Sequence, residues 1–82
     1  MRYVYFIRSL TKEGYIYTGY TNDLQRRLKE HNSENSKLAT CNYRPLELIA
    51  YIAVRDEKHA VNLEKYFKTG SGRAFFRKHL IC

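Results

Sequence analysis

The chain contains few cysteines and no long hydrophobic segment. Its 82 residues include only Cys41 and Cys82, which are too few for a cysteine metal cluster or a disulfide framework. We therefore expect both to be free thiols in a reducing compartment. No apolar run approaches the ~18 residues that a membrane span requires, and no signal peptide is recognisable at the start. These absences predict a cytoplasmic protein without a membrane partner.

Tryptophan is also absent, and acidic residues are scarce. Eight tyrosines supply most of the aromatic content, and 15 Lys and Arg residues against 8 Asp and Glu residues give a formal net charge of +7. This balance favours an anionic partner, and nucleic acid comes first because aromatic residues are interleaved with the cations. The simpler alternative is that a small soluble protein carries net charge for solubility.

The length and the hydrophobic pattern predict one domain, residues 1–82, built on a three-stranded sheet. Residues 3–8 and 15–20 form alternating strands, and Gly14 between them supplies the positive φ that a hairpin turn often needs. Residues 46–54 are almost continuously apolar, as expected of a strand covered on both faces. We therefore expect this third strand at the centre or the protected side of the sheet.

Three helices should pack around this sheet. The first follows Asn22, a good N-cap residue, and the second runs from a cap at Asp56 to about residue 69. Ser71 can cap a third helix over residues 72–80. The predicted fold class is thus α/β, or α+β by some definitions, with an antiparallel N-terminal hairpin and three surrounding helices.

Two pairs of residues could carry chemistry or simply pack. A symmetrical hairpin register would place Tyr5 and Tyr17 on one face, where a packed aromatic pair is the commoner explanation. Arg27 and His31 lie one helical turn apart and project side by side. Either they belong to a solvated basic surface, or Arg27 holds a phosphate while His31 accepts or relays a proton.

Glu64 also has two interpretations. It could form a surface salt bridge to Lys68, one helical turn further on. Alternatively, a carboxylate at the border of an apolar stripe could hold a hard cation such as Mg²⁺, which takes one or two carboxylates together with water and substrate phosphate. Residues 32–45 form a long polar segment, and connections of this length are more often functional or mobile than neutral.

The order of these residues resembles that of the GIY-YIG nuclease domain over nearly the whole chain. Tyr3-Val4-Tyr5 stands at the first motif and Tyr17-Thr18-Gly19 at the second, and Arg27 and His31 follow on the next helix. Glu64 falls where the family has its metal-binding glutamate. The small stand-alone members, similar to the nuclease module of bacterial excision-repair proteins, fit best. Tyr3 replaces the usual glycine, Thr18 replaces an aliphatic residue, and the family's later asparagine has no equivalent.

The resemblance implies an endonuclease that hydrolyses phosphodiester bonds in DNA with one divalent metal, Mg²⁺ or Mn²⁺, in DNA repair or recombination. It implies that Glu64 is the metal ligand and that the catalytic residues are Tyr5, Tyr17, Arg27, His31 and Glu64; which of them is the general base stays open. Sequence-independent backbone contacts would come from Arg26, Lys37, Arg44, Lys68, Arg73, Arg77 and Lys78. The alternative is a non-catalytic nucleic-acid-binding module on the same scaffold.

Overall fold

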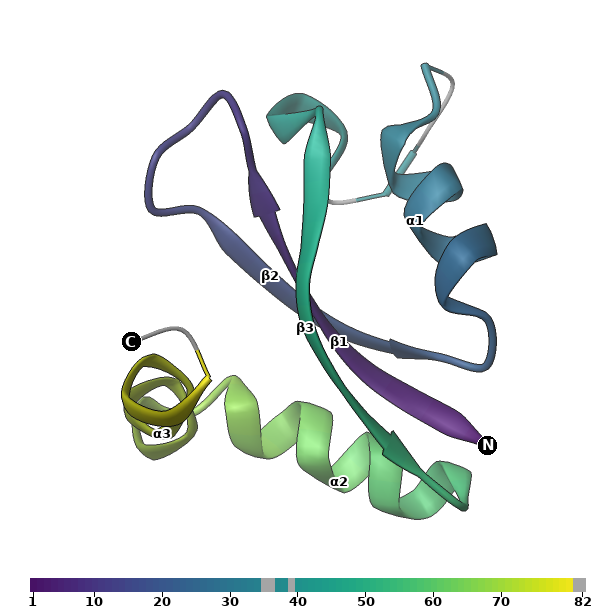
Figure 1. The fold of residues 1–82 in the computed structure, drawn as a ribbon, viewed down its shortest axis with the longest axis vertical. Helices are drawn as coiled ribbons and strands as arrows, with labels where there is room; N and C mark the ends of the chain where they lie inside the picture. The colour runs from purple at the N-terminus through teal and green to yellow at the C-terminus, as the bar shows by residue number, and fades with distance from the viewer. Residues whose placement is uncertain (35–36, 39, 81–82) are drawn as a thin grey trace.

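The computed structural model describes residues 1–34, 37–38 and 40–80, so Cys82 lies outside the described residues. In this part of the chain two strands are followed by a helix, a short 3₁₀ helix, a third strand and two further helices (Figure 1). This is the predicted α+β fold. The elements are β1 (Arg2–Ser9), β2 (Ile16–Thr21), α1 (Leu24–Asn32), η1 (Cys41–Tyr43), β3 (Leu46–Val54), α2 (Glu57–Phe67) and α3 (Gly70–His79).

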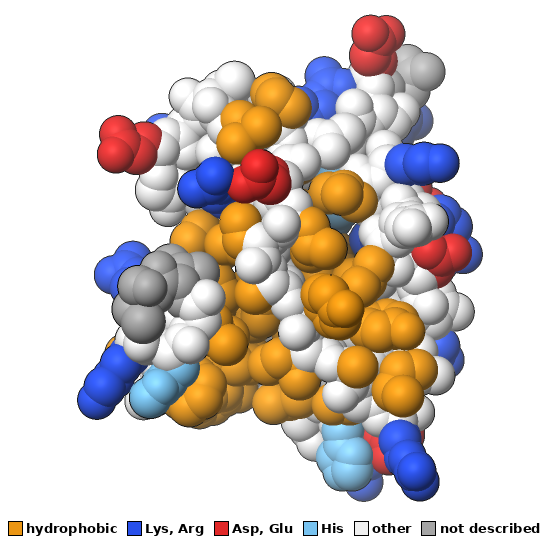
Figure 2. Space-filling model, in the orientation of Figure 1, with side chains coloured by type: hydrophobic (Ala, Val, Ile, Leu, Met, Phe, Trp, Pro, Cys, Tyr) orange, Lys and Arg blue, Asp and Glu red, His pale blue; other side chains and the backbone are white. Residues whose placement is uncertain are grey.

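The sheet is antiparallel with the strand order β2-β1-β3, so β1 is the central strand. The predicted bounds of β3 are right, but its predicted place at the centre or protected side is wrong. Only Val4 to Ile7 of β1 form an unbroken buried run, whereas β3 is an edge strand with alternating exposure and Tyr51 is 54% exposed. In Figure 2, hydrophobic side chains remain visible over β3 and beside α2 and α3.

The two faces of the sheet have separate cores. Val4 and Phe6 of β1 face α2 and α3, and they pack with Ala60, Phe67 and Phe76. The alternate β1 residues, Tyr5 and Ile7, face the other side and pack with Leu46, Leu24 and Leu28, the last two from α1. One helix, α1, therefore covers the face that carries Tyr5.

The hairpin has the predicted register and turn. Gly14 has a φ of 83°, the left-handed conformation that glycine adopts without strain. Tyr5 pairs with Gly19, and Ile7 pairs with Tyr17, so the two tyrosines share a face with their ring centroids 6.5 Å apart. The prediction that Tyr5 and Tyr17 are close is confirmed.

Two of the three predicted helix caps are wrong. The side chain of Asp23, not Asn22, caps α1 by accepting a hydrogen bond from the Arg26 amide. Thr69 rather than Ser71 caps α3, which begins at Gly70. The first turn of α3 packs so tightly on α2 that a Cβ on Gly72 would lie 2.0 Å from the Tyr66 carbonyl oxygen.

The predicted cap of α2 is confirmed, and the predicted end of this helix is nearly right. Asp56 caps α2 as predicted, through a 2.8 Å hydrogen bond from the His59 amide, although the helix ends at Phe67 rather than near residue 69. Among the described helices, none has the length and apolar character needed to cross a membrane. Cys41 is a free cysteine.

Candidate active site

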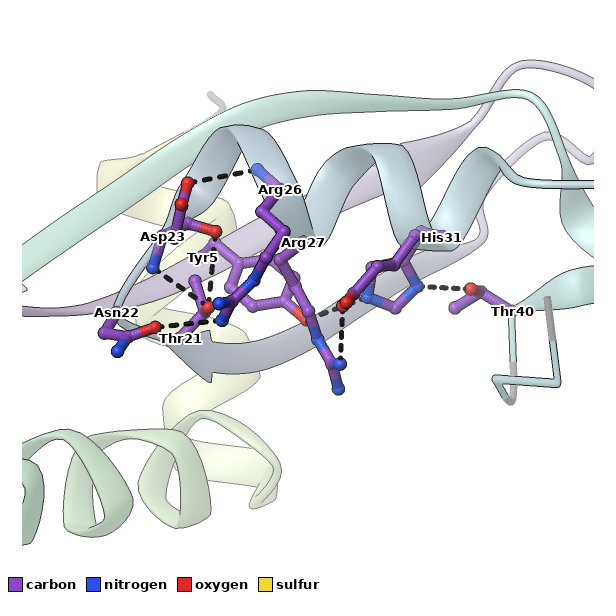
Figure 3. Close-up of polar contacts among 9 residues, drawn as sticks. Tyr5, Thr21, Asn22, Asp23, Arg26, Arg27, His31 and Thr40 are labelled. Atoms are coloured by element: carbon purple, nitrogen blue, oxygen red, sulfur yellow. Dashed lines mark hydrogen bonds and ion pairs between the residues drawn. The ribbon is translucent and has the colours of Figure 1, made fainter.

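The centre of the candidate site is a buried hydrogen bond between the hairpin and α1. The hydroxyl of Tyr5, from β1, lies 2.8 Å from Nε2 of His31, from the last turn of α1 (Figure 3). Tyr5 is 2% and His31 1% exposed, so both polar groups depend on protein partners. The sequence placed these residues in one site, and the structure brings them into direct contact.

Thr40 is a member of this group that sequence reasoning missed. Its side chain is completely buried, and its Oγ1 lies 2.5 Å from Nδ1 of His31. The imidazole is therefore held at both nitrogens, by Tyr5 on one side and Thr40 on the other (Figure 3). The only sequence signal was indirect: Thr40 belongs to the long polar segment after α1.

Burial sets the protonation states of both partners. It lowers the pKa of His31, and the nearby positive charge of Arg27 lowers it further. Burial likewise raises the pKa of Tyr5, although the hydrogen bond from Arg27 acts in the opposite direction. At neutral pH the site therefore contains a neutral imidazole against a protonated phenol.

Arg27 is held beside Tyr5 from the same helix as His31. Its Nε lies 3.4 Å from the Tyr5 hydroxyl, a long contact, and its Nη1 forms a 3.0 Å ion pair with Glu30. The hydrogen bond with Tyr5 and the Glu30 carboxylate raise the pKa of Arg27, which stays charged. The guanidinium remains half-buried and lines an open hollow, so it can also contact an anion.

Gly19 makes room for this arrangement. A Cβ on Gly19 would lie 2.6 Å from the Tyr5 hydroxyl oxygen and 3.1 Å from the Tyr17 ring. Only glycine leaves room for the Tyr5 hydroxyl at this position of β2. The Tyr17 ring completes the group, with its centroid 5.4 Å from the His31 ring centroid.

The end of α1 is tied to the sheet by one side chain. The Asn32 amide group accepts a 2.7 Å hydrogen bond from the Leu46 N–H and donates a 3.0 Å bond to the Leu46 carbonyl. Asn32 directly follows His31, so this two-point contact with the start of β3 fixes the position of the imidazole relative to the strands.

Glu64 reaches the same region from α2. Its side chain is 19% exposed and pairs with Lys68 at 3.3 Å, and the Lys68 ammonium lies 5.3 Å from the Tyr17 ring centroid. The Glu64 carboxylate is near enough to Tyr5 to contribute to its raised pKa. The salt bridge of the first interpretation is confirmed, and metal binding by Glu64 stays a prediction.

The donor set determines which metal the site could hold. Among the described residues, no group of three or more His, Cys, Asp and Glu side chains could enclose a metal ion. His31 has both nitrogens bonded, to Tyr5 and Thr40, so a ligand must come from a carboxylate, and Glu64 is the candidate that the sequence indicates. One carboxylate with room for water and phosphate suits Mg²⁺ or Mn²⁺ and does not suit a closed zinc site.

Basic side chains lie on either side of this centre. Arg2, Arg26 and Arg27 line one hollow of about 370 Å³. Lys68, Arg73 and Arg77 line another of about 390 Å³. Arg27, which contacts Tyr5, belongs to the 370 Å³ hollow, and Tyr17 and Lys68 belong to the 390 Å³ hollow. Cations therefore lie near both ends of β2.

The other predicted nucleic-acid-binding residues differ in their surroundings. Lys37 and Lys78 are exposed. Arg44 is half-buried, and it donates to the main-chain carbonyls of Cys41 (2.9 Å) and Ser33. Arg44 therefore organises the segment that carries Thr40, and its guanidinium is less available to a phosphate than those of Arg73 and Arg77.

Sequence comparisons show which proteins this chain resembles. A sequence model described as the GIY-YIG catalytic domain matches residues 1–78. The chain is 40% identical over 65 residues to a UPF0213 protein of Bacillus pumilus and 40% identical over 57 residues to UPF0213 protein YazA of Bacillus subtilis. It is 32% identical over 68 residues to a UPF0213 protein of Clostridium perfringens.

These matches cover 79%, 70% and 83% of this chain, in that order. They cover 66%, 58% and 71% of the relatives, so the chain spans less than two thirds of both Bacillus proteins. No solved structure matches.

Proposed function

The chain belongs to the GIY-YIG catalytic-domain family, and from that premise we propose that it is a divalent-metal-dependent DNA endonuclease. One observation carries the proposal: Tyr5, Arg27 and His31 are in contact around a buried phenol, beside the Glu64 carboxylate. A binding module needs exposed cations, but it does not need a neutral histidine buried against a tyrosine. We propose residues 1–82 as one such nuclease domain.

The proton chemistry follows from the protonation states. A phenol whose pKa is raised stays protonated at neutral pH, so Tyr5 can accept a proton only while its own proton leaves. His31 Nε2, 2.8 Å away, is the acceptor, and its lowered pKa keeps that nitrogen free of a proton beforehand. As water attacks phosphorus, its proton passes to the Tyr5 oxygen and the Tyr5 proton passes to Nε2.

This relay requires one tautomer of His31. Nδ1 must carry the hydrogen and donate it to Thr40 Oγ1, so that Nε2 can accept from Tyr5. The Tyr5 oxygen then accepts from Arg27 Nε while its own hydrogen points to His31. Thr40 is a positioning residue in this proposal, and Tyr17 orients the attacking water.

Two charged groups act on the phosphate. Arg27 contacts the phosphoryl oxygens, and its ion pair with Glu30 holds the guanidinium in place. Glu64 would hold Mg²⁺ or Mn²⁺, and such an ion would stabilise the charge that develops on the phosphoryl and leaving oxygens. The water attacks, the bond to the leaving oxygen breaks, and the strand is cut.

The setting of this activity is also part of the proposal. A role in DNA repair or recombination follows from the similarity to the nuclease module of excision-repair proteins. A reducing cytoplasm is consistent with the free thiol of Cys41. Binding independent of DNA sequence is consistent with cations that flank the site instead of a reading helix.

The test is Glu64→Gln, which removes the charge and keeps the size. We expect cleavage of plasmid or branched DNA with Mg²⁺ or Mn²⁺ to fall by at least ~10²-fold, because the metal's charge stabilisation is lost. Metal-free DNA affinity should persist or rise, since a negative charge near phosphate is removed. The matched control is Glu47→Gln, another carboxylate paired with a cation, Arg8, on the exposed part of β3.

The control should cleave like the parent. Equal cleavage by parent and Glu64→Gln would exclude Glu64 as the metal ligand. A parent that binds DNA and never cleaves it with either metal would establish the non-catalytic module instead.

A further inference from the structure

We propose that the hollow lined by Lys68, Arg73 and Arg77 binds an unpaired nucleotide of the substrate strand, next to the bond that is cut. This inference rests on the proposed nuclease function and adds a substrate class to it: nucleic acid with at least one base out of the duplex. The hollow is about 390 Å³ in volume, within the range of small-molecule sites in proteins.

Its lining combines two kinds of surface. Phe6, Phe67 and Phe76, all buried in the core, supply apolar lining. Tyr15, just before β2, and Tyr17, within it, also line the hollow. A phosphate alone has no apolar surface that could pack on five aromatic residues. A flat apolar group joined to an anion matches this surface, and a nucleotide has that composition.

The cations are placed for the anionic part. Arg73 and Arg77 lie one turn apart on α3, and neither makes an ion pair or side-chain hydrogen bond with another described residue. By contrast, Arg8 and Arg27 are each paired with a glutamate. The two α3 guanidinium groups are therefore unneutralised beside an aromatic hollow, where a backbone phosphate fits by charge.

The position of the hollow identifies the strand. Tyr17 lines the hollow and also packs 6.5 Å from Tyr5, and Lys68 lines the hollow and pairs with Glu64. A nucleotide in the hollow is thus adjacent to the phosphate that Tyr5 and Glu64 would act on. Bases inside a duplex are stacked and face inward, so only an unpaired or extruded base can enter.

The decisive comparison uses two oligonucleotides with equal phosphate charge. One is a thymidine strand of about ten nucleotides, and the other has the same length with every base replaced by hydrogen on the sugar. Affinity is measured by fluorescence anisotropy without divalent metal, so the result does not depend on cleavage. We expect the parent to prefer the strand with bases by at least ~10-fold, because stacking on aromatic side chains is lost in the other.

Thr18→Phe tests whether the preference for bases arises in this hollow. Thr18 lines the hollow from the edge strand β2, where an aromatic residue suits a strand, so the substitution fills the hollow without changing charge. We expect the base preference to disappear while the melting temperature and the affinity for the strand without bases are retained. The double substitution Arg73→Gln, Arg77→Gln should lower the affinity for both oligonucleotides. The control Arg55→Gln, Lys58→Gln removes equal charge elsewhere and should lower the affinity less.

Three results would overturn the inference. The parent could bind both oligonucleotides with equal affinity, which would mean that the protein contacts only their phosphates. The preference for bases could survive Thr18→Phe, which places the bases elsewhere. Free thymidine monophosphate could occupy the hollow as tightly as a nucleotide that is part of the strand. The hollow would then be a site for free mononucleotides. None of these depends on cleavage, and failure of the nuclease would leave this binding result intact.

Discussion

The hydroxyl oxygen of Tyr5 lies only 2.6 Å from the place that a Cβ on Gly19 would occupy. The two residues are paired across β1 and β2, so the missing side chain on one strand is the space that the phenol of the other fills. The glycine of the second family motif thus has a steric role at this site, although its φ is not positive.

Gly19→Ala should therefore displace the Tyr5 phenol from His31. We expect a destabilisation of about 1–3 kcal/mol from overpacking, and a loss of cleavage larger than the loss of folded protein explains. Thermal melts and cleavage rates at a temperature where both proteins are folded measure the two effects. Gly70→Ala is the matched control, because nothing lies within 4 Å of a Cβ there. Full activity in Gly19→Ala would contradict the steric role.

Thr40→Val should reveal the role of the buried hydroxyl. The shapes match, but Nδ1 of His31 loses its partner, so we expect a cost of about 1–3 kcal/mol for an unsatisfied buried polar group. Cleavage should fall further than stability, because the tautomer that lets Nε2 accept from Tyr5 is no longer fixed. Thr40→Ser keeps the hydroxyl and should restore both the rate and its pH profile. If Ser fails to restore the rate while the protein folds, Thr40 acts only by packing.

Acid should destabilise the fold through His31. Its pKa is lowered in the folded state, so below about pH 6.5 the unfolded chain binds a proton that the folded protein does not. The free energy of unfolding should be unaffected by His31 above that pH, fall as the pH drops below it, and level off only below the folded pKa. Urea melts across pH 4.5 to 8 of the parent and His31→Gln isolate this effect by difference. Parallel curves would contradict it.

DNA affinity should fall steeply with salt, because cations that neutralise phosphates release counterions. Arg26, which lines the hollow beside Arg27, gives a local test. Arg26→Gln should weaken binding evenly across DNA sequences and reduce the slope of log affinity against log salt by about 1. Lys58→Gln, an exposed cation in the first turn of α2, should change the slope less. Affinity that is equal at low and high salt would exclude the electrostatic account.

Local patterns were enough for much of the fold. The alternation in residues 3–8 and 15–20 and the glycine turn specified the hairpin, and the hairpin register placed Tyr5 near Tyr17. Helical spacing placed Arg27 and His31 side by side on α1. These relationships span few residues or one strand pair, so backbone periodicity determines them.

Other features depended on contacts between distant segments. The order of strands β2-β1-β3 is set by which strand the helices can bury from both sides, and an apolar run alone pointed to β3 instead of β1. The contact between Thr40 and His31 depends on how the polar segment after α1 folds back, which local patterns do not predict. The caps at Asp23 and Thr69 each lay within two residues of another good capping residue, so propensity could not separate them.

The two hydrogen bonds between the Asn32 side chain and Leu46 make one backbone proton a reporter of the site. The Leu46 N–H is bonded to a side chain of α1, so its exchange with solvent deuterium requires this bond to open, as it does when α1 separates from β3. His31 is the neighbour of Asn32, and such a separation also takes the imidazole away from Tyr5. The exchange rate at this single amide therefore reports how often α1 separates from β3 and the contact between Tyr5 and His31 opens.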